Sequence, residues 1–134
     1  MNQCAIALWN KEEYNYPMAI DFVPNIVPYL QEDDSVHPCM LVVPGGGYCF
    51  VSPSEGEIVA DRFRDKGYQT FVLTYTVNML MNEPLKDQPL KDIARAVRLI
   101  RKNAEKWHID PKRVYICGFS AGGHLCADAC VHFM

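Results

Sequence analysis

The chain has 134 residues, of which 49% are hydrophobic, and it carries a formal net charge of −3 at pH 7. This length and composition suffice for one folded domain with its own core, and they exclude an intrinsically disordered segment. The negative charge argues against a general nucleic-acid or anionic-membrane binder, and no apolar run approaches the length of a transmembrane helix.

The N-terminal residues and the cysteines indicate a cellular compartment. The first residues lack the basic region and continuous apolar segment of a secretory signal. The six cysteines show neither a disulfide framework nor the spacing of a zinc site. Cys39, Cys117, Cys126 and Cys130 lie in or beside predicted core elements, where cysteine acts as a small hydrophobic residue. We therefore expect reduced thiols in a cytoplasmic protein.

The first third of the chain is expected to form strands. Residues 5–9 and 25–30 are candidate strands, and Pro28 suits an edge strand better than a central one. After a polar turn at 31–38, residues 40–43 form an uninterrupted apolar run. Such a run is typical of a strand that is covered on both faces in a parallel sheet.

A glycine-rich loop follows this strand directly, with the sequence Pro44-Gly45-Gly46-Gly47-Tyr48. Its backbone N–H groups are not shielded by side chains, so they could point at a ligand. The alternative is that the three glycines form only a flexible turn. Because the loop leaves the carboxyl end of a strand, the position favours a loop that binds an oxyanion.

A helix is predicted to begin after this loop. Ser52 would be its N-cap, Pro53 its first residue and Glu55 the acid of a capping box. Gly67 fits the C-terminal cap. Three apolar side chains are expected on the inner face: Ile58, Val59 and Phe63.

The middle of the chain predicts a second buried strand at 69–75 and an exit loop at 76–88. This loop carries Met79, Leu80 and Met81. They could line an apolar pocket, because methionine adapts to varied shapes, or they could form the packed tip of a surface connection. The sequence leaves both possibilities open.

A long amphipathic helix is predicted from Pro89 to about Trp107. One stripe of this helix is apolar: Leu90, Ile93, Val97, Ile100 and Ala104. Its lysines and arginines fall elsewhere and indicate a solvated face rather than a binding patch. A turn at 109–113 then leads into the next strand.

The segment that organises the chain runs from Val114 to Leu125. An apolar strand ends at Gly118, and a helix-compatible run extends from Ala121 to Met134. Between them the G-x-S-x-G pattern is typical of a nucleophile elbow, a sharp strand-to-helix turn that exposes the serine hydroxyl. Side chains at either glycine would collide with the neighbouring strand and helix, and Ser120 itself is expected in a strained backbone conformation.

Strands that alternate with helices of this length give repeated βαβ units, and hence an α/β fold with a parallel sheet and right-handed crossovers. No internal repeat, low-complexity tract or linker divides the sequence. We therefore treat residues 1–134 as a single domain.

Four stretches together resemble the α/β-hydrolase superfamily, and most of all its esterase and lipase group, which includes acetyl-xylan-esterase-like and hormone-sensitive-lipase-like enzymes. The matching stretches are 44–48, 89–92, 110–114 and 118–125. The resemblance implies an α/β-hydrolase-like, mostly parallel sheet with flanking helices. It also implies that the chain is the N-terminal part of such a domain, with the later strands missing.

The resemblance also implies a reaction. Ser120 corresponds to the nucleophile, and the N–H groups of Gly46, Gly47 and Ala121 correspond to the oxyanion hole. Relatives usually have histidine where this chain has Pro44, a difference that affects the rigidity of the loop more than its chemistry. The implied function is hydrolysis of a small-molecule ester, such as an acetylated sugar, with no metal or organic cofactor.

A catalytic serine needs a base that is held by an acid, and in this fold both follow the serine in the chain. The four histidines are excluded by position: His124 and His132 lie along the helix after the serine, whereas His37 and His108 precede strands at the opposite edge of the sheet. Asp128 fails as the acid on similar geometry. We therefore expect the base and the acid outside this chain, and the isolated segment to be nearly inactive.

Other functions use the same scaffold. A truncated, non-catalytic relative or a binding module is the main alternative, because fold does not fix function. A peptidase or thioesterase would use the same residues and cannot be separated by sequence. The sequence does not indicate an oligomeric state.

Overall fold

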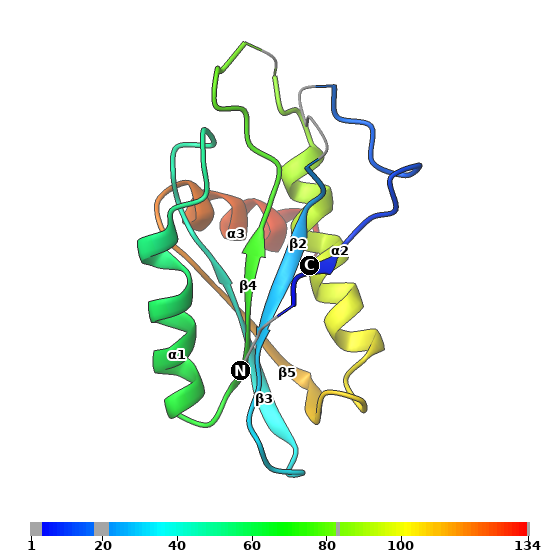
Figure 1. Cartoon of the computed structure of the whole chain (residues 1–134), viewed down its shortest axis with the longest axis vertical. Helices are drawn as coiled ribbons and strands as arrows, with labels where there is room; N and C mark the ends of the chain where they lie inside the picture. The colour runs from blue at the N-terminus through cyan, green and yellow to red at the C-terminus, as the bar shows by residue number, and fades with distance from the viewer. Residues whose placement is uncertain (1–3, 18–21, 83, 134) are drawn as a thin grey trace.

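The computed structural model describes residues 4–17, 22–82 and 84–133, so Met134 of the predicted last helix lies outside the described part. The strands form one sheet in the order β1-β2-β4-β3-β5, with helices on both faces (Figure 1). The strands are β1 (Ile6–Ala7), β2 (Asn25–Tyr29), β3 (His37–Val43), β4 (Gln69–Thr74) and β5 (Ile109–Gly118). The helices are the 3₁₀ turn η1 (Pro53–Glu55), α1 (Glu57–Asp65), α2 (Gln88–Lys102) and α3 (Ala121–His132).

The sheet is mixed, and it contains the parallel part that the sequence predicted. Strands β4, β3 and β5 run parallel, whereas β2 pairs antiparallel with β4 and with the short β1. β1 pairs with β2 only at Ile26 and Asn25, so it does not reach Pro28. A proline lacks the N–H that a central ladder would use, and this part of β2 behaves as an edge, as expected.

Strand β3 lies at the centre of two hydrophobic cores because its side chains alternate between the two faces of the sheet. Leu41 and Val43 pack in the larger core, which also holds buried residues of α2 and α3. Met40 and Val42 pack in the smaller core against α1. The apolar run of residues 40–43 is therefore covered on both faces, as predicted.

The start of the first helix differs from the prediction. Residues Pro53–Glu55 form a 3₁₀ turn, and Ser52 makes no side-chain capping bond. The carboxylate of Glu55 instead accepts a hydrogen bond of 2.9 Å from the N–H of Gly45. The predicted capping box is wrong, because a long-range donor has taken the carboxylate that the local rule assigned to the helix.

The inner face and the end of α1 follow the prediction more closely. Val59 and Phe63 pack against the smaller core, but Ile58 is 63% exposed and its predicted inward position is wrong. Gly67 has a φ of +94° and donates to Arg64. The next residue donates to Phe63, which completes a Schellman motif and confirms the predicted cap.

Helix α2 ends earlier than predicted, at Lys102 rather than near Trp107. The amide side chain of Asn103 donates to the carbonyl of Leu99 at 2.9 Å, and Ile109 donates to Ala104 at 2.8 Å. The carbonyls of Leu99 and Ala104 accept these bonds, and the chain then continues into β5. The apolar stripe is otherwise correct, since Ile93, Ile100 and Ala104 are buried in the larger core.

The predicted turn at 109–113 is part of β5. The register jumps from the pair His37–Ile109 to the pair Cys39–Val114, so the residues between them form an irregularity within the strand. Only β3 pairs with β5 among the described residues, and Tyr115 on β5 is 48% exposed.

The buried cysteines behave as small hydrophobic residues. Cys39 and Cys126 lie in the larger core, and burial raises the pKa of each thiol to about 12, which keeps both protonated. None of the helices in the described ranges is long and apolar enough to cross a membrane. The cytoplasmic location inferred from the thiols stays a prediction.

Candidate active site

Ser120 lies at the junction between β5 and α3, where the sequence placed the elbow. Its backbone has a φ of 52° and a ψ of −118°, a conformation that a residue with a side chain rarely adopts. The residue is exposed. Its hydroxyl makes no hydrogen bond with any residue that the structure describes. The expected strain and exposure are therefore present.

The two glycines around Ser120 are required by their surroundings. A Cβ at Gly118 would overlap the carbonyl of Gly122, and a Cβ at Gly122 would overlap the carbonyl of Val43. The first collision is with the following helix and the second with the neighbouring strand. This confirms the steric reason for the glycine spacing.

The glycine loop and the elbow are in contact. Val43 pairs with Gly118, so β3 and β5 end side by side at one edge of the sheet. Phe119 donates to the carbonyl of Val43 at 3.1 Å. A Cβ built on Gly45 would lie 3.0 Å from the Cβ of Ser120, which leaves room only for glycine. The loop and the serine therefore converge at the carboxyl edge of the sheet.

Three backbone amides at this edge are candidate oxyanion donors. Within the described part of the chain, the N–H groups of Gly46, Gly47 and Ala121 donate no hydrogen bond. Gly46 and Gly47 have φ values of 137° and 64°, which turn the backbone away from regular pairing. Ala121 begins α3, where N–H groups are unpaired and the helix dipole favours negative charge. These donors suit a developing oxyanion.

The glycine loop is held in place at its start. The buried hydroxyl of Tyr75 donates to the carbonyl of Pro44 at 2.6 Å, and burial raises the pKa of Tyr75, which keeps this donor protonated. The Glu55 carboxylate accepts from Gly45. Two side chains therefore support the loop at Pro44 and Gly45.

The loop is also held at its end by Tyr48. This residue has a φ of 63°, and its hydroxyl lies 2.7 Å from Nδ1 of His124 on α3. Its carbonyl accepts a 2.9 Å bond from the N–H of Asn78, in the exit loop of β4. Sequence reasoning missed Tyr48, Glu55, Tyr75 and His124 as supports, because their partners are distant in the chain.

A buried carboxylate lies behind this edge. Both oxygens of Asp92 on α2 are used: Oδ1 accepts from Trp9 and Gln88 at 2.9 Å, and Oδ2 accepts from the N–H and hydroxyl of Thr76 at 2.8 and 2.6 Å. Burial raises its pKa, whereas the four bonds lower it. Asp92 thus fixes the start of the exit loop of β4 to α2.

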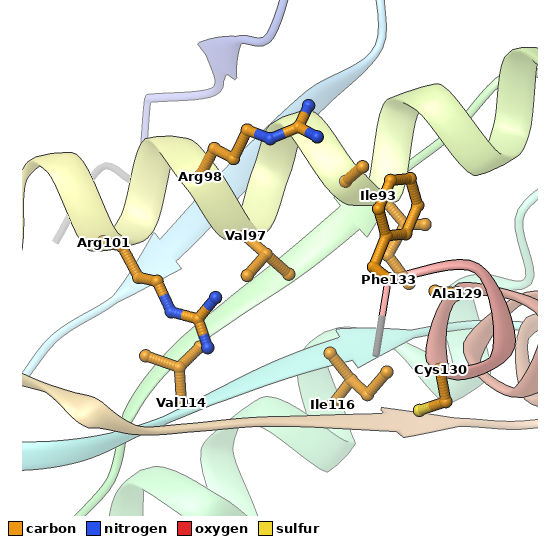
Figure 2. A pocket seen from close by; sticks show the side chains of 10 residues that line it. Ile93, Val97, Arg98, Arg101, Val114, Ile116, Ala129, Cys130 and Phe133 are labelled. Atoms are coloured by element: carbon orange, nitrogen blue, oxygen red, sulfur yellow. The ribbon is translucent and has the colours of Figure 1, made fainter.

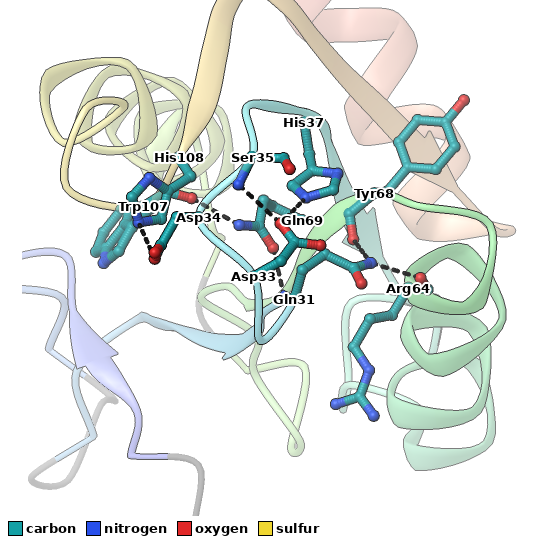
Figure 3. Close-up of polar contacts among 10 residues, drawn as sticks. All are labelled: Gln31, Asp33, Asp34, Ser35, His37, Arg64, Tyr68, Gln69, Trp107 and His108. Carbon is teal, nitrogen blue, oxygen red and sulfur yellow. Dashed lines mark hydrogen bonds and ion pairs between the residues drawn. The ribbon is translucent and has the colours of Figure 1, made fainter.

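The histidines lie where the sequence predicted. Nε2 of His37 lies 2.7 Å from Oδ1 of Asp33, and Nε2 of His108 lies 3.8 Å from Oδ1 of Asp34. Both pairs are at the edge where the parallel strands begin (Figure 3). His132 pairs with Asp128 further along α3. No histidine side chain of the described residues is hydrogen-bonded to the Ser120 hydroxyl; His124 contacts Ser120 only through its backbone N–H, which donates to the Ser120 carbonyl at 2.9 Å.

An apolar groove lies elsewhere on the molecule. A hollow of about 430 Å³ runs between α2, β5 and α3 (Figure 2). Ile93, Val97, Ile116 and Phe133 are among its lining residues, and neither Ser120 nor the glycine loop contributes to it. This groove therefore does not coincide with the candidate active site. No group of three or more potential metal ligands occurs among the residues described.

Comparison with known proteins gives a consistent set of relatives. The chain is 52% identical over 126 residues to endo-1,4-beta-xylanase B of Butyrivibrio fibrisolvens, covering 94% of this chain and 20% of that protein. It is 33% identical over 117 residues to acetylxylan esterase of Xylanibacter ruminicola, covering 85% of this chain and 23% of that protein. The chain thus spans about a fifth of the length of these relatives.

A solved structure shows the same architecture. The acetyl ester-xyloside bifunctional hydrolase of Caldicellulosiruptor lactoaceticus superposes with a TM-score of 0.85 at 39% identity, covering 92% of this chain and 45% of that one. The family model BD-FAE matches residues 27–132. The chain therefore belongs to the BD-FAE family, and its fold is that of the α/β-hydrolase esterases.

Proposed function

We propose that the protein is a serine carboxylic-ester hydrolase that works through an acyl-enzyme on Ser120. The observation that supports it is the convergence at the carboxyl edge. An exposed, strained serine lies against Gly45 of the glycine loop. The amides of Gly46 and Gly47 in that loop, and of Ala121 next to the serine, donate to no residue that the structure describes. Such an arrangement offers a nucleophile and preorganised donors for the same carbonyl group.

The proposed reaction has two halves. The hydroxyl oxygen of Ser120 attacks the ester carbonyl carbon while a base takes the hydroxyl proton. The amides of Gly46, Gly47 and Ala121 stabilise the oxyanion, and the alcohol then leaves with that proton. Water, deprotonated by the same base, attacks the acyl-enzyme, and release of the carboxylic acid restores the serine.

The base and the acid come from outside these 134 residues in this proposal. No described histidine side chain is bonded to the Ser120 hydroxyl, and the chain covers only 45% of the Caldicellulosiruptor hydrolase structure. The single-sided pairing of β5 and the apolar groove beside it are consistent with further chain packing there. The isolated segment is therefore expected to be nearly inactive.

The proposed substrate is a small ester on a sugar. One relative is named an acetylxylan esterase, and the solved relative an acetyl ester-xyloside hydrolase. Cleavage of the xylan backbone, which the name of the xylanase relative denotes, is not proposed, because a serine beside oxyanion donors suits acyl transfer, whereas glycoside hydrolysis uses a pair of carboxylates. An acetylated xylo-sugar is the substrate to assay first.

Active-site labelling tests the proposal. A fluorophosphonate probe should label the complete protein on Ser120, and labelling should be lost in Ser120→Ala. Ser54→Ala is a matched control, because Ser54 is also an exposed serine but lies on η1. A folded complete protein that reacts with no probe and hydrolyses no ester would favour the non-catalytic alternative.

A further inference from the structure

Besides the groove between α2, β5 and α3, a cavity lies at the carboxyl edge, next to the glycine loop. It has a volume of about 360 Å³, within the range of small-molecule sites. We call it the rim cavity. Its lining residues come from the glycine loop, the exit loop of β4, the start of α2 and the first half of α3: Gly47, Tyr48, Met81, Leu85, Lys86, Pro89, Leu90, His124, Leu125 and Asp128.

The rim cavity adjoins the candidate oxyanion hole. Gly47 belongs to both, since its N–H is one of the candidate oxyanion donors and its backbone lines the cavity. An ester whose carbonyl oxygen contacts this amide would have one of its two substituents close to the cavity mouth. The cavity is therefore within reach of the substrate of the proposed reaction.

The walls of the rim cavity are held by hydrogen bonds. Tyr48 on one wall is bonded to His124 on another, and their rings meet edge to face with centroids 5.8 Å apart. The side-chain oxygen of Asn78 accepts from the N–H of Met81 at 3.0 Å, which fixes the turn that carries this methionine. The cavity is thus largely preformed, with Met81 as an adaptable wall.

The lining is mainly apolar, with Leu90 and the buried Leu125 among its residues and a few polar groups around them. A sugar presents a hydroxyl on almost every carbon, and an apolar wall leaves such hydroxyls without partners. The sugar side of the proposed ester therefore fits this lining poorly. An alkyl chain loses nothing there and gains from burial.

We propose that the rim cavity receives the acyl chain of the ester, and that the protein accepts acyl groups longer than acetyl. This assignment rests on the proposed function, because it needs the carbonyl carbon at Ser120. Each methylene that enters the cavity should raise kcat/KM about fourfold, the rate equivalent of burying one CH₂.

The test narrows the cavity in the complete protein. Substrates are p-nitrophenyl acetate, butyrate and hexanoate, and the variants are Met81→Trp and Leu85→Trp. Each variant should lower kcat/KM for hexanoate about tenfold relative to acetate. Met79→Trp is the matched control: Met79 is 78% exposed and Met81 73%, both lie in the same loop, and Met79 does not line the cavity. Its chain-length preference should equal that of the wild type.

Two results would overturn the assignment. One is an unchanged preference for chain length in both tryptophan variants. The other is a loss of kcat/KM in the tryptophan variants that depends on the alcohol part of the ester. Such a loss would differ between methyl acetate and p-nitrophenyl acetate, which share the same acyl group. A wild type that reacts with no fluorophosphonate and no ester would instead remove the proposed function, and the cavity assignment with it.

Discussion

The two edges of the sheet are built in opposite ways. At the amino edge, where the parallel strands begin, polar groups are paired (Figure 3). The buried side chain of Gln69 accepts from the N–H of Gln31 at 2.6 Å and donates to the carbonyl of Trp107 at 2.8 Å. Gln31 in turn donates to the carbonyls of Arg64 and Tyr68. This edge ties the ends of three strands and α1 together.

At the carboxyl edge the backbone is strained, and the N–H groups of Gly46, Gly47 and Ala121 donate to no residue that the structure describes. Of the non-glycine residues with positive φ in the described part of the chain, four lie in loops at this edge: Tyr48, Met81, Lys86 and Ser120. The remaining one, His108, is at the amino edge. Strain of this kind persists only where the surrounding structure imposes it. The comparison indicates that one edge stabilises the fold while the other is arranged for binding and chemistry.

The largest expected effect comes from Gly122→Ala. The added Cβ would overlap the carbonyl of Val43, so the elbow must move away from β3. We expect a loss of about 3 kcal/mol in the free energy of unfolding, measured by denaturant titration, together with loss of fluorophosphonate labelling. Gly123→Ala is the control. Its Cβ would lie 3.3 Å from the Gly118 carbonyl oxygen, whereas a Cβ on Gly122 would overlap the Val43 carbonyl oxygen. Equal stability of both variants would contradict the close approach of helix and strand.

Gln69→Ala tests the amino edge alone. It leaves a backbone donor of Gln31 and the carbonyl of Trp107 without their partner. The free energy of unfolding should fall by about 2 kcal/mol, since unpaired buried polar groups are costly. The kcat/KM of the complete protein, measured below its unfolding temperature, should stay the same. A large fall in kcat/KM without unfolding would show that the two edges are coupled.

Ser120→Gly separates strain from chemistry. Glycine tolerates the positive φ of this position, so the variant should be about 1 kcal/mol more stable than the wild type, while its esterase activity is lost. Ser120→Ala removes the same hydroxyl but keeps a Cβ, and it should not show the gain. Thermal or denaturant unfolding of the two variants compares them directly. Equal stability would mean that the backbone at Ser120 stores little strain.

The smallest expected effect is a pH dependence at Asp33. Its hydrogen bond with His37, and then that with the Ser35 amide, holds its pKa below the usual 3.8, so folding favours the ionised form. The contribution to stability is present above that unfolded value and is lost as the pH falls through the lowered pKa. Asp33→Asn should be slightly less stable than the wild type at neutral pH, with the difference vanishing in acid. Because Asp33 is exposed, the effect should be the weakest of the four.

Features that depend on neighbouring residues were predicted well. The buried strand at 40–43, the C-terminal cap at Gly67 and the elbow glycines follow from local rules of burial and backbone sterics. These rules hold wherever the segment lies in the fold. The turn at Ser120 was therefore predicted between the strand and the helix that flank it in the structure.

Features with two competing partners were predicted poorly. The capping box assigned Glu55 to its own helix, but the N–H of Gly45 took the carboxylate. Ile58 fitted an inward stripe, yet it is exposed because Val59, Ala60 and Phe63 form the face of α1 that packs against the smaller core. Sequence periodicity cannot show which of two donors or faces is nearer in space.

The sequence by itself determined which strands and helices follow one another along the chain, the elbow around Ser120 and the position of the glycine loop. Each of these depends on short-range sterics and burial. Only the tertiary structure decided what supports them: Tyr75 on Pro44, Tyr48 on His124 and Asp92 between Trp9 and Thr76. Such pairs join residues far apart in the chain. Their geometry exists only after the sheet and helices have packed, so no local pattern encodes them.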